Sequence, residues 1–203
     1  MVTVYKKIRM KTLLVFFVAL VSLLWAANSL AGDDPQERAS REVIARLAMS
    51  AEAKAKVDAV FTQYQGTIEA RKKAMDEAYS KALDAQFDRI KNKTSGDDVK
   101  AAKATWDRET KLYETTIHER DGKVKQSLPP ALAPKFERGM KLVTEREGKC
   151  ETVLKESFDK MMKGATQAER DKIQADANKK FDAIYDEYDK KLDAEVGKVI
   201  EKK

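Results

Sequence analysis

Residues 57–90 read VDAVFTQYQGTIEARKKAMDEAYSKALDAQFDRI, and their pattern indicates the fold class of this 203-residue chain. Apolar residues at spacings of four and three share one face of an α-helix. With Ser50 as its N-cap, the segment predicts one helix of about 40 residues, roughly 60 Å long. The spacings of four from Met75 to Phe87 depart from a strict heptad and predict local unwinding of a supercoil there. The apolar face consists of Val57, Phe61, Tyr64, Ile68, Met75, Tyr79, Leu83, Phe87 and Ile90.

Helix start and stop signals divide the sequence around this segment. Asp34 and Pro35 predict a short helix that ends near Met49, because Asp is a favoured N-cap and Pro is tolerated at the first helical position. The glycine and the capping side chains of residues 94–98 predict a turn, after which a second helix returns to Leu128. These two helices and the short one before them form the first predicted hairpin.

A second hairpin follows the Pro129-Pro130 pair, which a helix cannot continue through. The pattern predicts a third helix over 134–161, stopped by Gly164. Thr166-Gln167-Ala168-Glu169 is a capping box and predicts the start of a last helix that reaches about Val199.

The expected architecture is therefore all-α. It consists of long antiparallel hairpins, over about 35–127 and 131–203, in one helical domain that forms an extended bundle or coiled coil. No segment alternates apolar and polar residues long enough to indicate a sheet.

Residues 1–31 have the three parts of a secretory signal peptide. Four cations and no acid precede an apolar run at 13–27, and Ser29 and Ala31 are small residues of the kind that a signal peptidase requires. We expect cleavage after Ala31, a periplasmic or secreted location, and no stable membrane span after processing. An uncleaved N-terminal anchor helix is the alternative.

The charge of the processed chain differs from that of the precursor. The precursor has 40 Lys and Arg against 34 Asp and Glu, and removal of residues 1–31 leaves 36 against 34. A protein this close to neutral has no electrostatic reason to bind nucleic acid. Charges of both signs are interleaved along the chain, as is typical of long solvated helices.

Candidates for chemistry are few. Glu114, His118 and Asp121 are spaced to share a helical face and are the candidate metal ligands, although a lone His among solvated charges is the commoner situation. Cys150 falls on the apolar face of the third helix and is expected to be buried, with an intersubunit disulfide as the alternative. Because no haem-attachment, phosphate-loop or nucleophile motif occurs, we expect neither enzyme activity nor a cofactor.

Three segments resemble the helix-start motif Leu-Thr-x-x-Gln of the Spy/CpxP-type periplasmic stress chaperones. They are 49–53 (MSAEA), 165–169 (ATQAE) and 128–136 (LPPALAPKF). The resemblance implies long bent helices that form a cradle, usually as a homodimer, in which unfolded or envelope proteins are held without nucleotide.

Phe136, Met140, Phe158 and Met161 are the predicted client-binding residues, because Met and Phe at helical spacing can form an adaptable apolar surface. Buried core is the alternative role for them. A structural coiled-coil protein of the envelope, whose apolar faces are covered by its own helices, is the alternative function.

Processing of the precursor can be tested directly. We predict that intact-mass analysis of the protein purified from its native host finds Gly32 as the first residue. A mature form that retains residues 1–31 would favour the anchor alternative.

Overall fold

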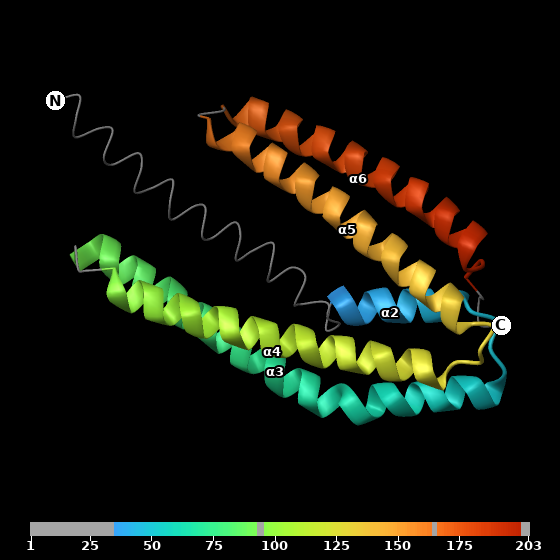
Figure 1. Cartoon of the computed structure of the whole chain (residues 1–203). Coiled ribbons are helices and arrows are strands. Elements are labelled where there is room, and N and C mark those ends of the chain that lie inside the picture. The colour runs from blue at the N-terminus through green and yellow to red at the C-terminus, as the bar shows by residue number, and fades with distance from the viewer. Residues whose placement is uncertain (1–34, 93–95, 164–165, 200–203) are drawn as a thin grey trace. The chain divides into compact units, whose positions relative to one another are not determined.

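The computed structural model describes residues 35–92, 96–163 and 166–199. These residues form five α-helices and no strand, which confirms the all-α prediction (Figure 1). The predicted signal peptide lies outside the described residues. The helices are α2 (Pro35–Arg46), α3 (Ala51–Asn92), α4 (Asp97–Ser127), α5 (Ala133–Met162) and α6 (Gln167–Glu195).

Several helix ends form as the local sequence predicts. The hydroxyl of Ser50 accepts a hydrogen bond of 3.2 Å from the backbone N–H of Ala53 at the start of α3. At the start of α6, Thr166 Oγ1 accepts from the backbone N–H of Glu169, and Glu169 Oε2 accepts from the backbone N–H of Thr166 at 2.6 Å. Leu128 ends α4 with an extended backbone, the conformation that a following proline requires.

Two helix ends differ from the prediction. The first helix ends at Arg46 rather than near Met49, and the last ends at Glu195 rather than near Val199. Gly197 explains the second difference, because it has a φ of 140° and its backbone N–H donates to the carbonyl of Leu192. A glycine in this position ends a helix at low conformational cost.

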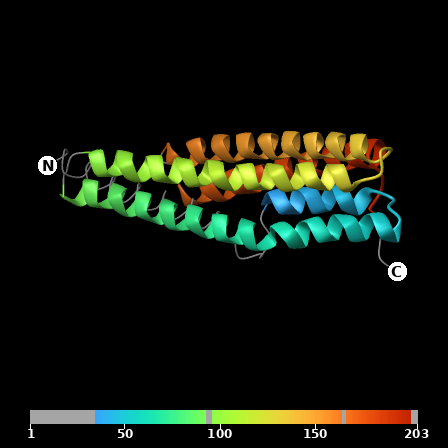
Figure 2. The same cartoon turned by 60° about the horizontal axis from the view of Figure 1, so that its bottom comes forward.

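The chain divides into two compact units, and α3 and α4 form one of them as an antiparallel hairpin (Figures 1 and 2). Ile68 and Met75 of α3 are buried with Tyr113 and Ile117 of α4. Towards the Pro129-Pro130 end, the fully buried guanidinium of Arg120 lies 5.0 Å from the ring centre of Phe61, and it donates to Asp121.

Beyond Met75, the inward face of α3 combines alanines with larger side chains. Ala78 is buried and Ala82 is half-buried, whereas Phe87 is 36% exposed. Tyr79 and Leu83, which follow Met75 at spacings of four, are half-buried as well. Of the predicted apolar residues from Met75 to Phe87, Phe87 is the one that is exposed. The local unwinding of a supercoil there stays a prediction.

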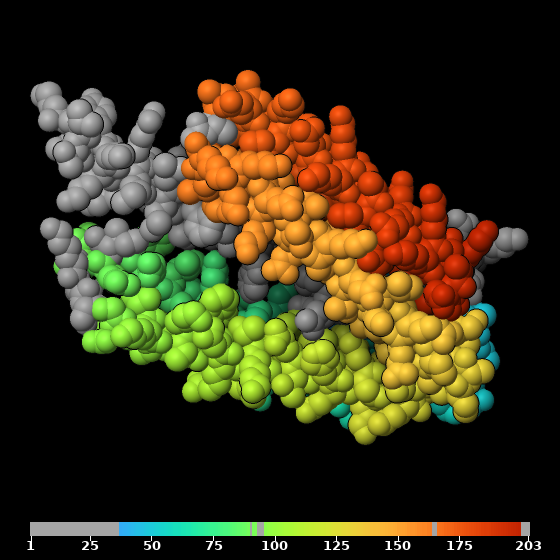
Figure 3. Space-filling model, turned by 45° about the horizontal axis from the view of Figure 1, so that its top comes forward, coloured from blue at the N-terminus to red at the C-terminus, as the bar shows by residue number. Residues whose placement is uncertain are grey.

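The other unit consists of α2, α5 and α6. Lys149 of α5 contacts Glu187 of α6, and seven residues further along α5, Glu156 contacts Lys180, seven residues earlier in α6. This register shows an antiparallel pair, and Figure 3 shows the side chains of α5 and α6 in contact along the hairpin. The inward positions of α5 follow a heptad and are Phe136, Gly139, Val143, Arg146, Cys150 and Val153.

The short helix α2 belongs to this unit, whereas the sequence had placed it with the first hairpin. Arg146 of α5 donates two hydrogen bonds, of 2.9 and 2.8 Å, to the carboxylate of Glu42. Arg46 donates to Asp189 at 2.8 Å and also to Asp193. Charge pairs between residues more than a hundred positions apart, together with burial of Val43, therefore hold α2 on α5 and α6.

Gly139 provides the space for this packing. A Cβ atom at position 139 would lie 2.5 Å from Cγ1 of Val43 and 3.0 Å from Cγ2 of Val196. Neither contact is allowed without movement of the neighbouring side chain or of the helix.

We predict that Gly139→Ala lowers the free energy of unfolding by about 1–3 kcal/mol, because overpacking outweighs the gain in helix propensity. Gly148→Ala in the same helix is the matched control, since a Cβ there meets no atom within 4 Å. The control should raise stability by up to about 1 kcal/mol. Urea denaturation followed by circular dichroism measures both, and an equal gain in the two variants would contradict the close packing of α2.

Candidate functional site

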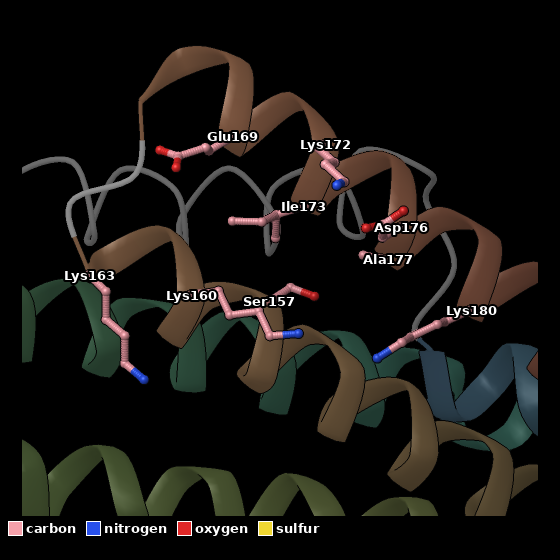
Figure 4. A pocket seen from close by; sticks show the side chains of 9 residues that line it. All are labelled: Ser157, Lys160, Lys163, Glu169, Lys172, Ile173, Asp176, Ala177 and Lys180. Carbon is pink, nitrogen blue, oxygen red and sulfur yellow. The ribbon is translucent and has the colours of Figure 1, made fainter.

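A cleft of about 680 Å³ lies between the last turns of α5 and the first turns of α6 (Figure 4). It is lined by Ser157 and Lys160 of α5 and by Lys163, which directly follows this helix. From α6 it is lined by Glu169, Lys172, Ile173, Asp176, Ala177 and Lys180. We call the space that these residues line the α5–α6 cleft.

The cleft begins where the apolar contact between the two helices ends. Cys150 and Val153 are buried, but the next inward positions of α5, in the same heptad register, are Ser157 and Lys160. A small hydroxyl and a solvated ammonium cannot fill the space that a pair of large apolar residues would fill. On α6, Ala177 is buried but small, and Ile173 is only half-buried.

Positive charge prevails in the α5–α6 cleft. Lys180 is 3.5 Å from Glu156, whereas in the described part of the chain no ion pair forms at Lys160, Lys163 or Lys172. Glu169 and Asp176 oppose the four lysines of the lining, and the carboxylate of Glu169 accepts hydrogen bonds from the backbone and the hydroxyl of Thr166. These bonds lower the pKa of Glu169. Glu169 therefore stays ionised, and the lining holds four ammonium groups against two carboxylates.

An apolar strip on α5 lies next to the residues of the α5–α6 cleft in the sequence. Leu154 is 42% exposed and Met162 is 36% exposed, and Phe158 and Met161 between them are half-buried. Positions 154, 158, 161 and 162 fall on one side of a helix. These four side chains are called the apolar strip below.

The structure separates the four predicted client-binding residues. Phe136 is only 3% exposed and belongs to the core, next to the base of the hairpin. Met140, Phe158 and Met161 are half-buried, and the last two lie in the apolar strip. Leu154 is exposed, and the neighbouring Val153 takes the inward position.

The predicted metal ligands are not brought together as a site. Glu114 and His118 are exposed on α4, and Asp121 accepts hydrogen bonds of 3.0 and 2.9 Å from Arg120. No group of three or more His, Cys, Asp or Glu is placed to hold a metal ion within the ranges that the structure describes.

Cys150 is buried in α5, as its place in the apolar pattern predicts. Burial raises the pKa of its thiol, and the charge of Glu147 adds to this effect. Arg146 lies one turn earlier, with its guanidinium 4.7 Å from the ring centre of Tyr185. Burial by itself would lower the pKa of Arg146, but hydrogen bonds and charge from Glu42 and Glu147 raise it, so the guanidinium stays charged.

Sequence reasoning did not single out the lysines of the α5–α6 cleft. Lys160 and Lys163 near the end of one predicted helix, and Lys172 near the start of the next, are ordinary residues of a solvated surface when each helix is viewed alone. The sequence feature that could have indicated them is that they lie on both sides of Gly164, where the two helices of a hairpin must come together.

Comparisons with protein-family models, with curated proteins and with solved structures find no match to this chain. Within the described residues, no helix combines the length and the apolar character needed to cross a membrane.

Cys150 provides a test of the packing next to the α5–α6 cleft. We predict that its thiol reacts slowly in the native protein and fast in urea, and that Cys150→Ser lowers the free energy of unfolding by about 1–2 kcal/mol. Because the folded pKa is raised, the neutral thiol stabilises the fold below the unfolded pKa, and this contribution falls as the pH rises above about 8.5. Thiol labelling and urea denaturation measure these effects. Fast native labelling, or a dimer that disappears on reduction, would show an accessible or bridging cysteine.

Proposed function

We propose that this protein is an exported, ATP-independent binding protein that holds non-native or envelope proteins on the apolar strip of α5. The observation that carries the proposal is the exposure of Leu154 and Met162, with Phe158 and Met161 half-buried between them. Apolar side chains that stay partly exposed along one side of a helix, on a charge-rich protein, are typical of a surface that meets a partner.

The composition of the apolar strip suits varied clients. Methionine is unbranched and polarisable, so it adapts to different partner shapes, and phenylalanine adds a large apolar contact area. Charged residues flank the strip on the same helix, among them Lys155, Glu156 and Lys160. These charges would keep a complex with an unfolded client in solution.

The resemblance of three helix starts to those of the Spy/CpxP-type chaperones supports the same function. It also suggests a homodimer as the working form. Neither the client-holding activity that we propose nor its surface requires a nucleotide, a metal ion or a catalytic residue.

A structural coiled-coil protein of the envelope is the second candidate. The heptad positions of α5, and the alanines that continue the inward face of α3, favour it, because both are typical of helices that are covered by other helices of the same protein. In that case the apolar strip would have no client.

Light scattering from an aggregating client, in the presence of the processed protein, tests the proposal. We predict that the wild-type protein suppresses aggregation and that Leu154→Ala combined with Met162→Ala weakens suppression severalfold. Because both side chains are exposed, stability should change by no more than about 0.5 kcal/mol for each substitution.

Two control variants make the result specific. Leu112→Ala removes a leucine of α4 that is 37% exposed, close to the exposure of Leu154, and should leave client protection unchanged. Phe136→Ala removes a buried side chain and should cost about 3–5 kcal/mol of stability. If the wild type gives no protection, or if Leu112→Ala weakens it as much as the double variant does, the client-holding function is wrong and the structural candidate stands.

A further inference from the structure

We propose that the α5–α6 cleft binds a small amphipathic anion, a single alkyl or acyl chain that carries a carboxylate or phosphate group. The proposal does not depend on client holding, because the cleft and the apolar strip use different side chains. The volume of about 680 Å³ is within the range of roughly 300–1,000 Å³ that small-molecule sites have.

The floor of the α5–α6 cleft is suited to an apolar chain. The side chain of Ile173 points from α6 into the space between the helices in Figure 4, and Ala177 lies one turn further along α6. Ile173 is half-buried, so part of its surface remains open to a ligand. The butyl stems of the lining lysines extend the carbon surface, while their ammonium groups stay in solvent.

The rim of the α5–α6 cleft is suited to an anionic group. Lys160 comes from α5 and Lys180 from α6, and Lys180 reaches across to within 3.5 Å of Glu156, one turn before Lys160. An anion between the helices would therefore meet Lys160 from one side and Lys180 from the other, with Lys180 exchanging its contact with Glu156 for the anion. Lys160 and Lys172 have no ion pair within the described ranges, so no carboxylate has to be displaced from them.

A small ligand fits better than a polypeptide. The cleft ends where α5 and α6 close at Val153, so it does not continue along the hairpin as a groove. A bound peptide would also need partners for its backbone, and the N–H and C=O groups along the interior of α5 and α6 are already bonded within each helix. A detergent-like molecule with one charged end has no such requirement.

Isothermal titration calorimetry with three probes tests the proposal on the whole processed protein. We expect dodecyl phosphate, kept below its micelle concentration, to bind at one site per chain. Dodecyl maltoside has the same chain without the charge, and butyl phosphate has a similar charge without the chain. Both should bind at least tenfold more weakly, and equal binding of either would overturn the proposal.

Matched variants locate the site. Lys160→Gln combined with Lys180→Gln should weaken dodecyl phosphate binding at least tenfold, as should Ile173→Gln with the charge unchanged. Lys155→Gln combined with Lys190→Gln removes the same charge from exposed positions of the same two helices and should leave the affinity unchanged. An equal loss in this control would show binding by bulk charge and overturn the proposal. Unchanged melting temperatures show that each variant is folded.

Two further binding experiments distinguish a free small ligand from a membrane surface and from a polypeptide. Binding to vesicles that contain phosphatidic acid, without binding to monomeric dodecyl phosphate, would assign the charge to a membrane surface and overturn the free-ligand proposal. A synthetic acidic peptide that contains Leu and Phe, and that binds where dodecyl phosphate does not, would assign the cleft to polypeptide. Failure of all probes together with intact client protection would overturn this inference and leave the proposed function standing.

Discussion

The close approach of α2 to α5 at Gly139 is the constraint on which the α2–α5–α6 unit depends. The absent side chain of Gly139 leaves room for Val43 and Val196, and the helices then come near enough for Arg146 to bond Glu42 with both of its terminal nitrogens. Burial of a charge lowers stability unless the charge is paired and hydrogen-bonded.

The buried guanidinium of Arg46 is also paired, with Asp189 and Asp193 of α6. Removal of one partner would leave a charge with no compensation, so these pairs specify where α2 must lie.

The two ends of the α5–α6 hairpin differ in packing because the inward residues change along it. Near its base, Phe136, Val143 and Val153 give a packed interior, and Tyr188 and Leu192 of α6 are buried at the corresponding end. Beyond Val153 the inward residues are Ser157 and Lys160, and the two helices no longer share an apolar interior. The stability of the hairpin therefore comes from its base. The open end carries exposed apolar and cationic groups.

In the α3–α4 hairpin the size of the inward side chains also changes along the helices. Aromatic and large aliphatic side chains pack in its middle, where Tyr79 and Trp106 lie 5.2 Å apart between ring centres. Towards the end of α3, Ala78 and Ala82 share the inward side with Leu83, and lysines and aspartates take the outward positions. Small inward residues bury little apolar surface, so the contribution of each turn to stability falls along this part of the hairpin.

The sequence by itself determined the secondary structure, because caps, prolines and helical periodicity act within a few residues. Ser50, the Thr166–Glu169 capping box and Pro129 set helix ends where expected, and the position of Cys150 in the apolar pattern placed it in the core. Only the tertiary structure decided that α2 joins α5 and α6, that Phe136 is buried whereas Leu154 is exposed, and that lysines from two helices surround one cleft. The physical reason is that these features depend on which residues of different helices meet, and a periodic pattern gives the face of a helix only to within about one position. Alanine, glycine and paired arginine at inward positions carry little hydrophobic signal, yet here they set how the helices approach one another.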